Sequence, residues 1–377
     1  MIGTPSFTSL HGWFLVQALP LWSCYGVDRQ SGGFFEKLYP SLNPTNEPRR
    51  TRLVARQIYW FTVGEALGWQ GAADELIDHG FQFLSRYLVS PEGHVRASCT
   101  ANGDLIDSRQ HLYDVAFVLV ALARQAHRRP DSLEPEALAR RIVNRLRLNP
   151  HGGYHDDVTP DVQCANPHMH LFEAFLCWSN LQDNGDDFWC HRAAALAQLA
   201  VEHMIQPQFG ALPEHFDLSW RPIRQDGFLR IEPGHQFEWS WLLAQWASFS
   251  GDSTIAAAAQ RLCHQAEVFG VDKQRNVVIE CINDQLLPSN TTARLWQQTE
   301  RLKAWHHQTQ IKGLETACRY RDQALESLLH FLSGPRPGLW FDEMDSSGRF
   351  LELPVKASSG YHIACAIEEL FVPIACR

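Results

Sequence analysis

The stretch Glu232-Pro233-Gly234-His235-Gln236-Phe237-Glu238-Trp239-Ser240-Trp241 decides the fold, because it contains a junction that recurs along the chain. A loop stops at Pro233-Gly234 and passes into an apolar helix whose first turn carries His235 and Glu238. Residues three apart share a helix face, so this imidazole lies beside a carboxylate that can orient or charge it. One His-x-x-Glu pair is more often a cap or surface pair than a catalytic one. Its significance comes from the similar junctions elsewhere.

The composition is that of an ordinary soluble globular protein. Of 377 residues, 45% are hydrophobic and 20% are charged, and the formal net charge is -9. Because no basic block is present to neutralise phosphates, we expect no nucleic-acid partner. No apolar run reaches the length of a membrane span, and no basic segment precedes an apolar core as in a signal peptide. The ten cysteines form no Cys-x-x-Cys pair and read as reduced thiols, so we expect a cytoplasmic protein, either monomer or homodimer.

A repeating unit of a glycine-started short strand, a turn and two helices runs along the chain. Apolar residues at helical spacing predict twelve helices. Their approximate ranges are 9–25, 52–67, 72–87, 110–128, 133–148, 168–181, 188–204, 235–249, 254–269, 292–311, 315–332 and 358–370. A short strand hairpin is predicted before every second helix, as at Gly152–Asp157 and Gly338–Glu343.

Polar residues recur with the same period at the starts of these second helices. The positions, roughly 60 residues apart, are Arg56, Tyr113, His170, His235 with Glu238, Glu300 and His362. Six helical hairpins of constant period can bury their apolar faces against one another and close into a ring. We therefore predict an all-α fold, an (α/α)6 barrel spanning residues 1–377 as a single domain, with short β-hairpins in the loops on the active-site face. The N-terminal ends of six inner helices open onto that face.

An open helical solenoid is the alternative architecture. In it the same polar residues line a concave groove that binds a sugar or a protein without catalysis. The period here is longer than that of the common solenoid repeats, and it includes a strand pair that those repeats lack. These differences favour the closed barrel.

The histidines of the predicted pocket allow two kinds of chemistry. His168 and His170 are two apart and cannot share a helix face, so they have different roles. His170, His235 and His362 with Glu238 form a set that zinc or manganese could accept. Arg56, predicted in the same pocket, disfavours a metal because its guanidinium repels a cation.

Acid–base chemistry is the second kind. Two histidines with an arginine, a tyrosine and carboxylates suit removal of a proton next to a carbonyl, with stabilisation of the enediol oxygen. A glycosidase would need two carboxylates flanking the scissile bond, for which Glu238 with Glu300, or Asp156 with Asp342, are available. That interpretation leaves the histidines without a purpose. No phosphate-binding or dinucleotide-binding glycine motif is present.

Several of these motifs together resemble the N-acylglucosamine 2-epimerase family, which also contains bacterial mannose isomerases, sulfoquinovose isomerases and cellobiose 2-epimerases. The resemblance runs in order from about Gly32 to His362 and is closest in character to the D-mannose isomerases. The motifs that carry it are Arg49–Tyr59 (RRTRLVARQIY), Leu112–Phe117 (LYDVAF), Asn166–Ala174 (NPHMHLFEA), Pro233–Trp239 (PGHQFEW) and Tyr361-His362. It implies a six-hairpin α/α barrel and metal-independent chemistry at C2 of a reducing sugar, without a cofactor.

The resemblance also implies a role for each matching position. His235 and His362 look like the catalytic acid/base pair, and Glu238 like the carboxylate that supports them. The substrate-binding residues that it implies are Arg56, Tyr113, Asn166, His170, Trp296 and Glu300. Only one tryptophan, Trp296, stands where cellobiose epimerases tend to carry two, which argues against a disaccharide stacked there.

The working hypothesis is an isomerase that acts on a free monosaccharide, in the simplest case converting D-mannose to D-fructose through a cis-enediol. An N-acyl-D-glucosamine 2-epimerase, a sulfoquinovose isomerase and a cellobiose 2-epimerase are the alternatives within the family. A sugar- or protein-binding toroid without activity is the alternative outside it.

Overall fold

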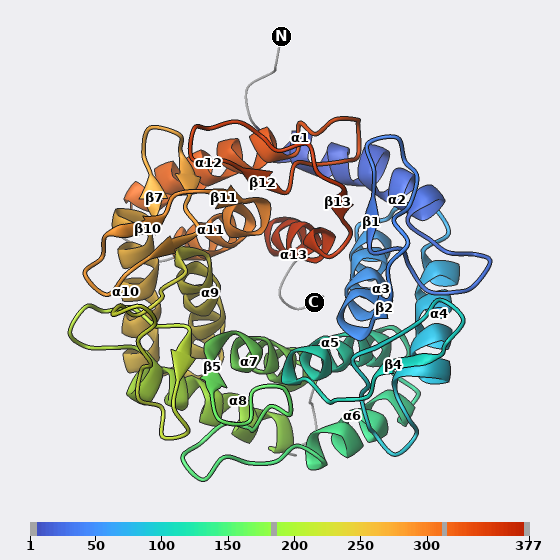
Figure 1. Cartoon of the computed structure of the whole chain (residues 1–377), viewed down its shortest axis with the longest axis horizontal. Coiled ribbons are helices and arrows are strands. Elements are labelled where there is room, and N and C mark those ends of the chain that lie inside the picture. The colour runs from blue at the N-terminus through green and yellow to red at the C-terminus, as the bar shows by residue number, and fades with distance from the viewer. Residues whose placement is uncertain (1–5, 182–186, 311–314, 373–377) are drawn as a thin grey trace.

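A computed structural model describes residues 6–181, 187–310 and 315–372 as two concentric rings of helices (Figure 1). Twelve helices make up the rings in this part of the chain when α1 and α2, which a π-helical turn joins, are counted as one. The inner ring contains α3 (Thr51–Ala66), α5 (Leu112–Arg128), α7 (Ala165–Ser179), α9 (Pro233–Ser250), α11 (Leu295–Gln308) and α13 (Ser359–Phe371). Because α13 packs against both α3 and α11, the ring is closed. The predicted α/α barrel is therefore confirmed, and the open solenoid is wrong.

The outer ring contains the alternate helices of each hairpin. Its members are α1 (Phe7–Trp13) joined to α2 (Leu19–Tyr25), α4 (Ala73–Phe83), α6 (Glu134–Asn144), α8 (Phe188–Leu199), α10 (Ser253–Phe269) and α12 (Glu315–Phe331). Three π-helical turns, Phe14–Ala18, Leu84–Leu88 and Ala200–Met204, link α1 to α2 and extend α4 and α8. The predicted ranges differ from these mainly at their ends, and the predicted end at residue 311 lies outside the described residues.

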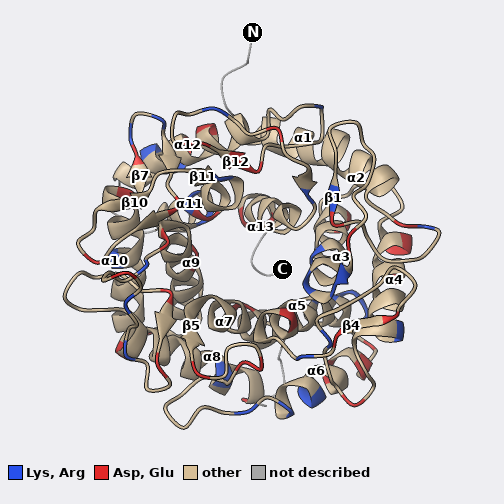
Figure 2. Ribbon diagram, in the orientation of Figure 1, with Lys and Arg blue, Asp and Glu red and all other residues tan. Residues whose placement is uncertain are grey.

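Helices that are buried on all sides form the inner ring. In α9 nearly every residue from Pro233 to Ala247 is buried, so the helix has no solvent face and belongs in the inner ring. Charged residues lie mostly on the outer helices and the loops, and most of the inner ring is uncharged (Figure 2). Among the described helices, none is long and apolar enough to cross a membrane.

Short strands lie in the loops at one end of the barrel. Three pairs are local hairpins: β3 (Ser98–Cys99) with β4 (Leu105–Asp107), β7 (Val271–Asp272) with β8 (Val277–Val278), and β9 (Cys281–Ile282) with β10 (Pro288–Asn290). The prediction of a hairpin before every second helix is therefore only partly right: at Gly152–Asp157, Tyr154 makes an isolated bridge with Leu148, and the strand at Glu343 pairs with a neighbouring loop. The other antiparallel pairs join neighbouring loops, which the sequence did not indicate: β1 (Lys37–Leu38) with β13 (Val355–Lys356), β2 (Arg49–Arg50) with β3, β5 (Gln163–Cys164) with β6 (His215–Phe216), and β11 (Ala293–Arg294) with β12 (Glu343–Met344). The β1–β13 pair ties the first repeat to the last.

Gly80→Ala is expected to destabilise the barrel even though alanine favours helices. A Cβ added at Gly80 of α4 would lie 2.5 Å from Ile58 Cγ1 of α3, and overpacking of this kind costs about 1–3 kcal/mol of unfolding free energy. The matched control is Gly12→Ala in α1, where no heavy atom lies within 4 Å and helix propensity should add up to ~1 kcal/mol. Urea unfolding of both variants checks the signs. Equal effects would contradict the tight α3–α4 contact.

Candidate active site

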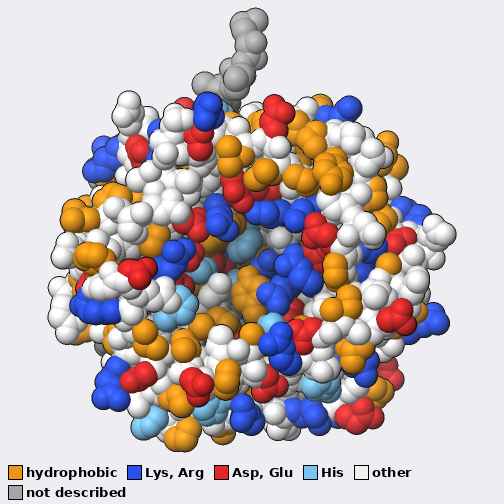
Figure 3. All heavy atoms as spheres, in the orientation of Figure 1, with side chains coloured by type: hydrophobic (Ala, Val, Ile, Leu, Met, Phe, Trp, Pro, Cys, Tyr) orange, Lys and Arg blue, Asp and Glu red, His pale blue; other side chains and the backbone are white. Residues whose placement is uncertain are grey.

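The N-terminal ends of the inner helices surround a cavity of about 650 Å³ at the end of the barrel that carries the strands. It opens as a central hollow, with histidine side chains visible at its floor (Figure 3). Eight of the nine predicted site residues line it, namely Arg56, Tyr113, Asn166, His170, His235, Glu238, Trp296 and His362. The ninth, Glu300, is fully buried behind His362 and does not line the cavity. The repeat therefore brought the predicted residues together, although Glu300 is placed to act through a histidine.

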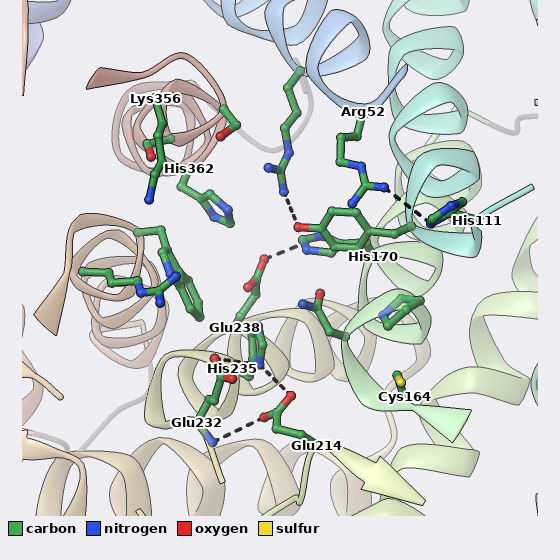
Figure 4. Close-up of a pocket in the computed structure, with 18 of the residues that line it drawn as sticks. Arg52, His111, Cys164, His170, Glu214, Glu232, His235, Glu238, Lys356 and His362 are labelled. Atoms are coloured by element: carbon green, nitrogen blue, oxygen red, sulfur yellow. Dashed lines mark hydrogen bonds and ion pairs between the residues drawn. The ribbon is translucent and has the colours of Figure 1, made fainter. Parts of the chain in front are cut away.

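His235 is held in a charged form by carboxylates from the preceding loop. Its Nδ1 donates to Glu214 Oε2 at 2.9 Å and lies 3.7 Å from Glu232 Oε2 (Figure 4). Burial disfavours the imidazolium, but the charges of Glu214 and Glu232 and the hydrogen bond outweigh it and raise the pKa of His235 to about 10. His235 therefore carries a proton at neutral pH.

His362 is held in the neutral form. Burial, followed by the positive charges of Arg56 and Lys303, keeps the pKa of His362 well below its usual value. Nδ1 lies 2.9 Å from Glu300 Oε1, so a neutral ring donates from Nδ1 and keeps a lone pair on Nε2. The neutral imidazole of His362, which lines the cavity, can therefore accept a proton on Nε2 and act as a base.

Glu300 is fixed in turn by a buried lysine. Lys303 Nζ lies 2.6 Å from Glu300 Oε2 and 3.7 Å from the centroid of the Trp241 ring, and both ionic side chains are inaccessible to solvent. Burial disfavours the charge on Lys303, but Cys365, Glu300 and Glu238 raise its pKa above the usual value. The lysine therefore keeps a positive charge behind the His362–Glu300 pair.

His170 and Glu238 lie between the two catalytic candidates. His170 Nδ1 donates to Glu173 Oε2 at 2.9 Å, and Glu173 Oε1 accepts from Tyr361 at 2.6 Å. Glu238 lies 3.8 Å from His170 Nδ1, and neither of its oxygens has a hydrogen-bond partner within the described residues. Burial and the nearby charge of Glu300 raise the pKa of Glu238 well above its usual value. A protonated Glu238 can donate to a ligand oxygen in the cavity.

Arg56 and Trp296 complete the floor and wall. Arg56 Nη2 donates to Tyr113 Oη at 2.6 Å, and its guanidinium lies 4.0 Å from the centroid of the Phe117 ring, without a carboxylate partner in the described chain. The Trp296 ring centroid is 4.9 Å from that of His235 and 5.6 Å from that of His362. The tryptophan therefore spans the space between the two histidines and offers a flat apolar face to a sugar.

Sequence reasoning missed the groups that set the histidines' charges. Glu214 lies 21 residues before His235, in a loop, and nothing local connects the two. Glu173 and Lys303 each follow a site residue by three positions, after His170 and Glu300. Their i,i+3 spacing, on helices buried nearly all round, was the available signal.

Three groups of side chains have the separation of metal ligands: His170, Glu173 and Glu238; Glu214, Glu232 and His235; and Glu238, Glu300 and His362. Metal ligands must be deprotonated. In each group the histidine Nδ1 already pairs with a carboxylate: His170 with Glu173, His235 with Glu214 and His362 with Glu300. These histidine–carboxylate pairs are also the arrangement that acid–base chemistry uses.

Comparisons with known proteins agree with the fold and show the family. Over 370 residues the chain is 36% identical to a mannose-6-phosphate isomerase of Rhizobium meliloti, covering 96% of this chain and 95% of that one. Two solved structures share the fold. A cellobiose 2-epimerase of Bacillus thermoamylovorans matches with a TM-score of 0.86 and 17% identity, covering 97% of this chain and 98% of that one. A D-mannose isomerase matches with a TM-score of 0.85 and 20% identity, covering 98% of this chain and 99% of that one. The sequence profile of the N-acylglucosamine 2-epimerase (GlcNAc 2-epimerase) family matches residues 33–366. The chain thus belongs to the N-acylglucosamine 2-epimerase family and is a sugar isomerase or epimerase.

Proposed function

We propose that this protein interconverts D-mannose and D-fructose by proton transfer between C2 and C1. The observation that carries the proposal is the pair of histidines with opposite charge states on one cavity, neutral His362 and protonated His235. Environments that push two pKa values apart assign a base and an acid. The names of the relatives, a mannose-6-phosphate isomerase and a D-mannose isomerase, share the mannose skeleton and support the same C1–C2 chemistry.

The proposed mechanism acts on the open-chain sugar. His362 Nε2 removes the proton from C2 while His235 donates its proton to O1, giving a neutral cis-enediol. Arg56, Tyr113 and a protonated Glu238 stabilise the oxygens as charge develops on them. His235 then recovers a proton from O2, and His362 returns its proton to C1, so the aldose becomes a ketose. The proton that His362 takes from C2 exchanges with solvent on the imidazole before one is delivered to C1, and both histidines end in their starting protonation states.

Glu300 and Glu214 act through the histidines in this proposal. Glu300, held by Lys303, fixes His362 in the tautomer that keeps Nε2 free. Glu214 keeps His235 protonated. Because each acts through the histidine that it contacts, both are positioning residues.

Epimerisation at C2 is the second candidate. The protonated state of His235 favours it, because a charged imidazole on the other face of the enediol could deliver a proton to C2. From mannose, this outcome gives glucose instead of fructose.

The test is proton NMR of D-mannose with the purified protein in D2O and EDTA. We expect fructose to form with deuterium at C1, in the presence of the chelator. Glucose with deuterium at C2 would instead establish epimerisation. Absence of both products, with no loss of the C2 proton signal, would overturn the proposal.

A further inference from the structure

The mouth of the cavity carries a ring of basic side chains, which we call the rim cations: Arg50, Arg52, Arg230, Arg294 and Lys356. Figure 3 shows lysine and arginine side chains gathered around the central hollow. The proposed C1–C2 chemistry needs none of them, because the histidines, Glu238 and Arg56 provide its acid, base and oxygen contacts. The rim cations are therefore available for a function other than proton transfer.

Each rim cation is held from behind by a carboxylate that is more buried than itself. The side chain of Arg294 is 45% exposed, whereas that of its partner Glu280 is 6% exposed, with Nε and Oε2 2.9 Å apart. The same order holds for Arg50 on Glu36, Arg52 on Asp114, Arg230 on Glu232 and Lys356 on Glu343. The rim thus presents cationic heads to the opening and places the balancing negative charges behind them.

The charged groups of two rim cations, Arg294 and Lys356, lie near each other and beside the catalytic histidines. Arg294 and Glu343 face each other across the β11–β12 ladder, and Lys356 Nζ lies 2.7 Å from Glu343 Oε1. Lys356 projects into the same opening as His362 (Figure 4), and Arg294 lies two residues before Trp296. Within the described chain, the terminal nitrogens of Arg294 make no hydrogen bond, so they remain available to a ligand. The planar guanidinium of an arginine can donate two parallel hydrogen bonds to the oxygens of a phosphate.

The orientation of the sugar follows from the proposed function, on which this inference rests. C1 and C2 must reach His235 and His362 at the floor, so the far end of a hexose points toward the mouth. We propose that the preferred substrate carries a phosphate on C6, and that Arg294 and Lys356, with Arg230 beside them, bind it. Arg230 lies 3.5 Å from the Glu280 carboxylate that also holds Arg294, so its charge adds to theirs.

A neutral second sugar is the alternative occupant of the mouth. Stacking of a disaccharide requires aromatic faces, and Trp296 is the one tryptophan among the described residues that line the cavity. Trp296 already spans the two histidines. The mouth itself is charged, which suits an anion better than a second neutral ring.

The test compares kcat/KM for D-mannose 6-phosphate and D-mannose, measured by formation of the ketose. We expect the phosphorylated sugar to be preferred at least tenfold, and the preference to shrink as KCl screens the rim charges. Arg294→Gln and Lys356→Gln should each reduce the preference roughly tenfold, the effect of one lost charge-assisted hydrogen bond. The control is Arg129→Gln: Arg129 is also ion-paired at the surface, with Asp78, but it ends α5 at the opposite end of the barrel, so the preference should stay unchanged.

Three outcomes would overturn the phosphate assignment. D-Mannose could be turned over as well as its phosphate, the preference could survive both substitutions, or a 6-deoxy-6-sulfo sugar could be preferred over the phosphate. Failure of the proposed function is distinguishable, because then neither mannose nor its phosphate would form a ketose.

Discussion

His362→Gln is expected to lower kcat for mannose by about 10²–10⁴ and to stop exchange of the C2 hydrogen with solvent, because the variant lacks the base. Glutamine can still donate an amide hydrogen to Glu300, so the buried carboxylate keeps a partner and the fold survives. The amide cannot accept and return a proton near neutral pH. Steady-state kinetics and proton NMR in D2O measure the two effects separately.

The matched control for this experiment is His127→Gln. His127 lies in the last turn of α5, away from the cavity that His362 lines, so its replacement should leave kcat unchanged. Circular dichroism confirms that both variants fold. A His362→Gln enzyme that kept a tenth or more of the wild-type kcat, with C2 exchange intact, would remove His362 from the role of base.

The barrel could be predicted because the sequence features that specify it, apolar helix faces and polar residues near helix starts, repeat along the chain. Helix-spaced apolar residues marked the twelve helices, and Arg56, Tyr113 and His170 stand near the starts of successive inner helices, as His362 does in the last. Most of the polar residues predicted near the N-terminal ends of the inner helices reach the central cavity, and Glu300, buried behind His362, is the exception. Strand pairing was less predictable, because β1 meets β13 only once the ring has closed.

The charge states of the site could not be read in the same way. Sequence spacing paired His235 with Glu238, since residues three apart share a helix face. In the structure Nδ1 of His235 turns toward Glu214, and Glu238 lies nearer His170. Burial then decides which carboxylates ionise, and burial is a property of the assembled ring. The acid and the base are therefore distinguished by groups distant in sequence.

Glu214→Gln tests this assignment through the pH dependence of kcat. Glutamine keeps an oxygen that accepts from His235 Nδ1 but removes the negative charge, so the pKa of His235 should fall from about 10 toward its usual value, with burial pushing in the same direction. In the wild type the acid stays protonated up to about pH 10, whereas in the variant the basic limb should move to about pH 7. At pH 9 that shift leaves roughly one molecule in a hundred with a protonated acid, so kcat should fall about a hundredfold. At pH 6 most of the activity should return, which a merely structural defect would not allow.

Stability should follow the same titration. Because the folded-state pKa of His235 is raised, its ion pair with Glu214 stabilises the barrel fully below pH 6.5, and this contribution is lost as the pH rises through about 10. The wild-type Tm should therefore decline over that window, and the decline should be smaller in Glu214→Gln. The control is Glu232→Gln, which removes the more distant carboxylate, 3.7 Å from Nδ1, and should move the basic limb of kcat less. If the basic limb stayed in place in both variants, His235 would not be the acid, and the high pKa that Glu214 gives it would serve only to hold the loop before α9 against the helix.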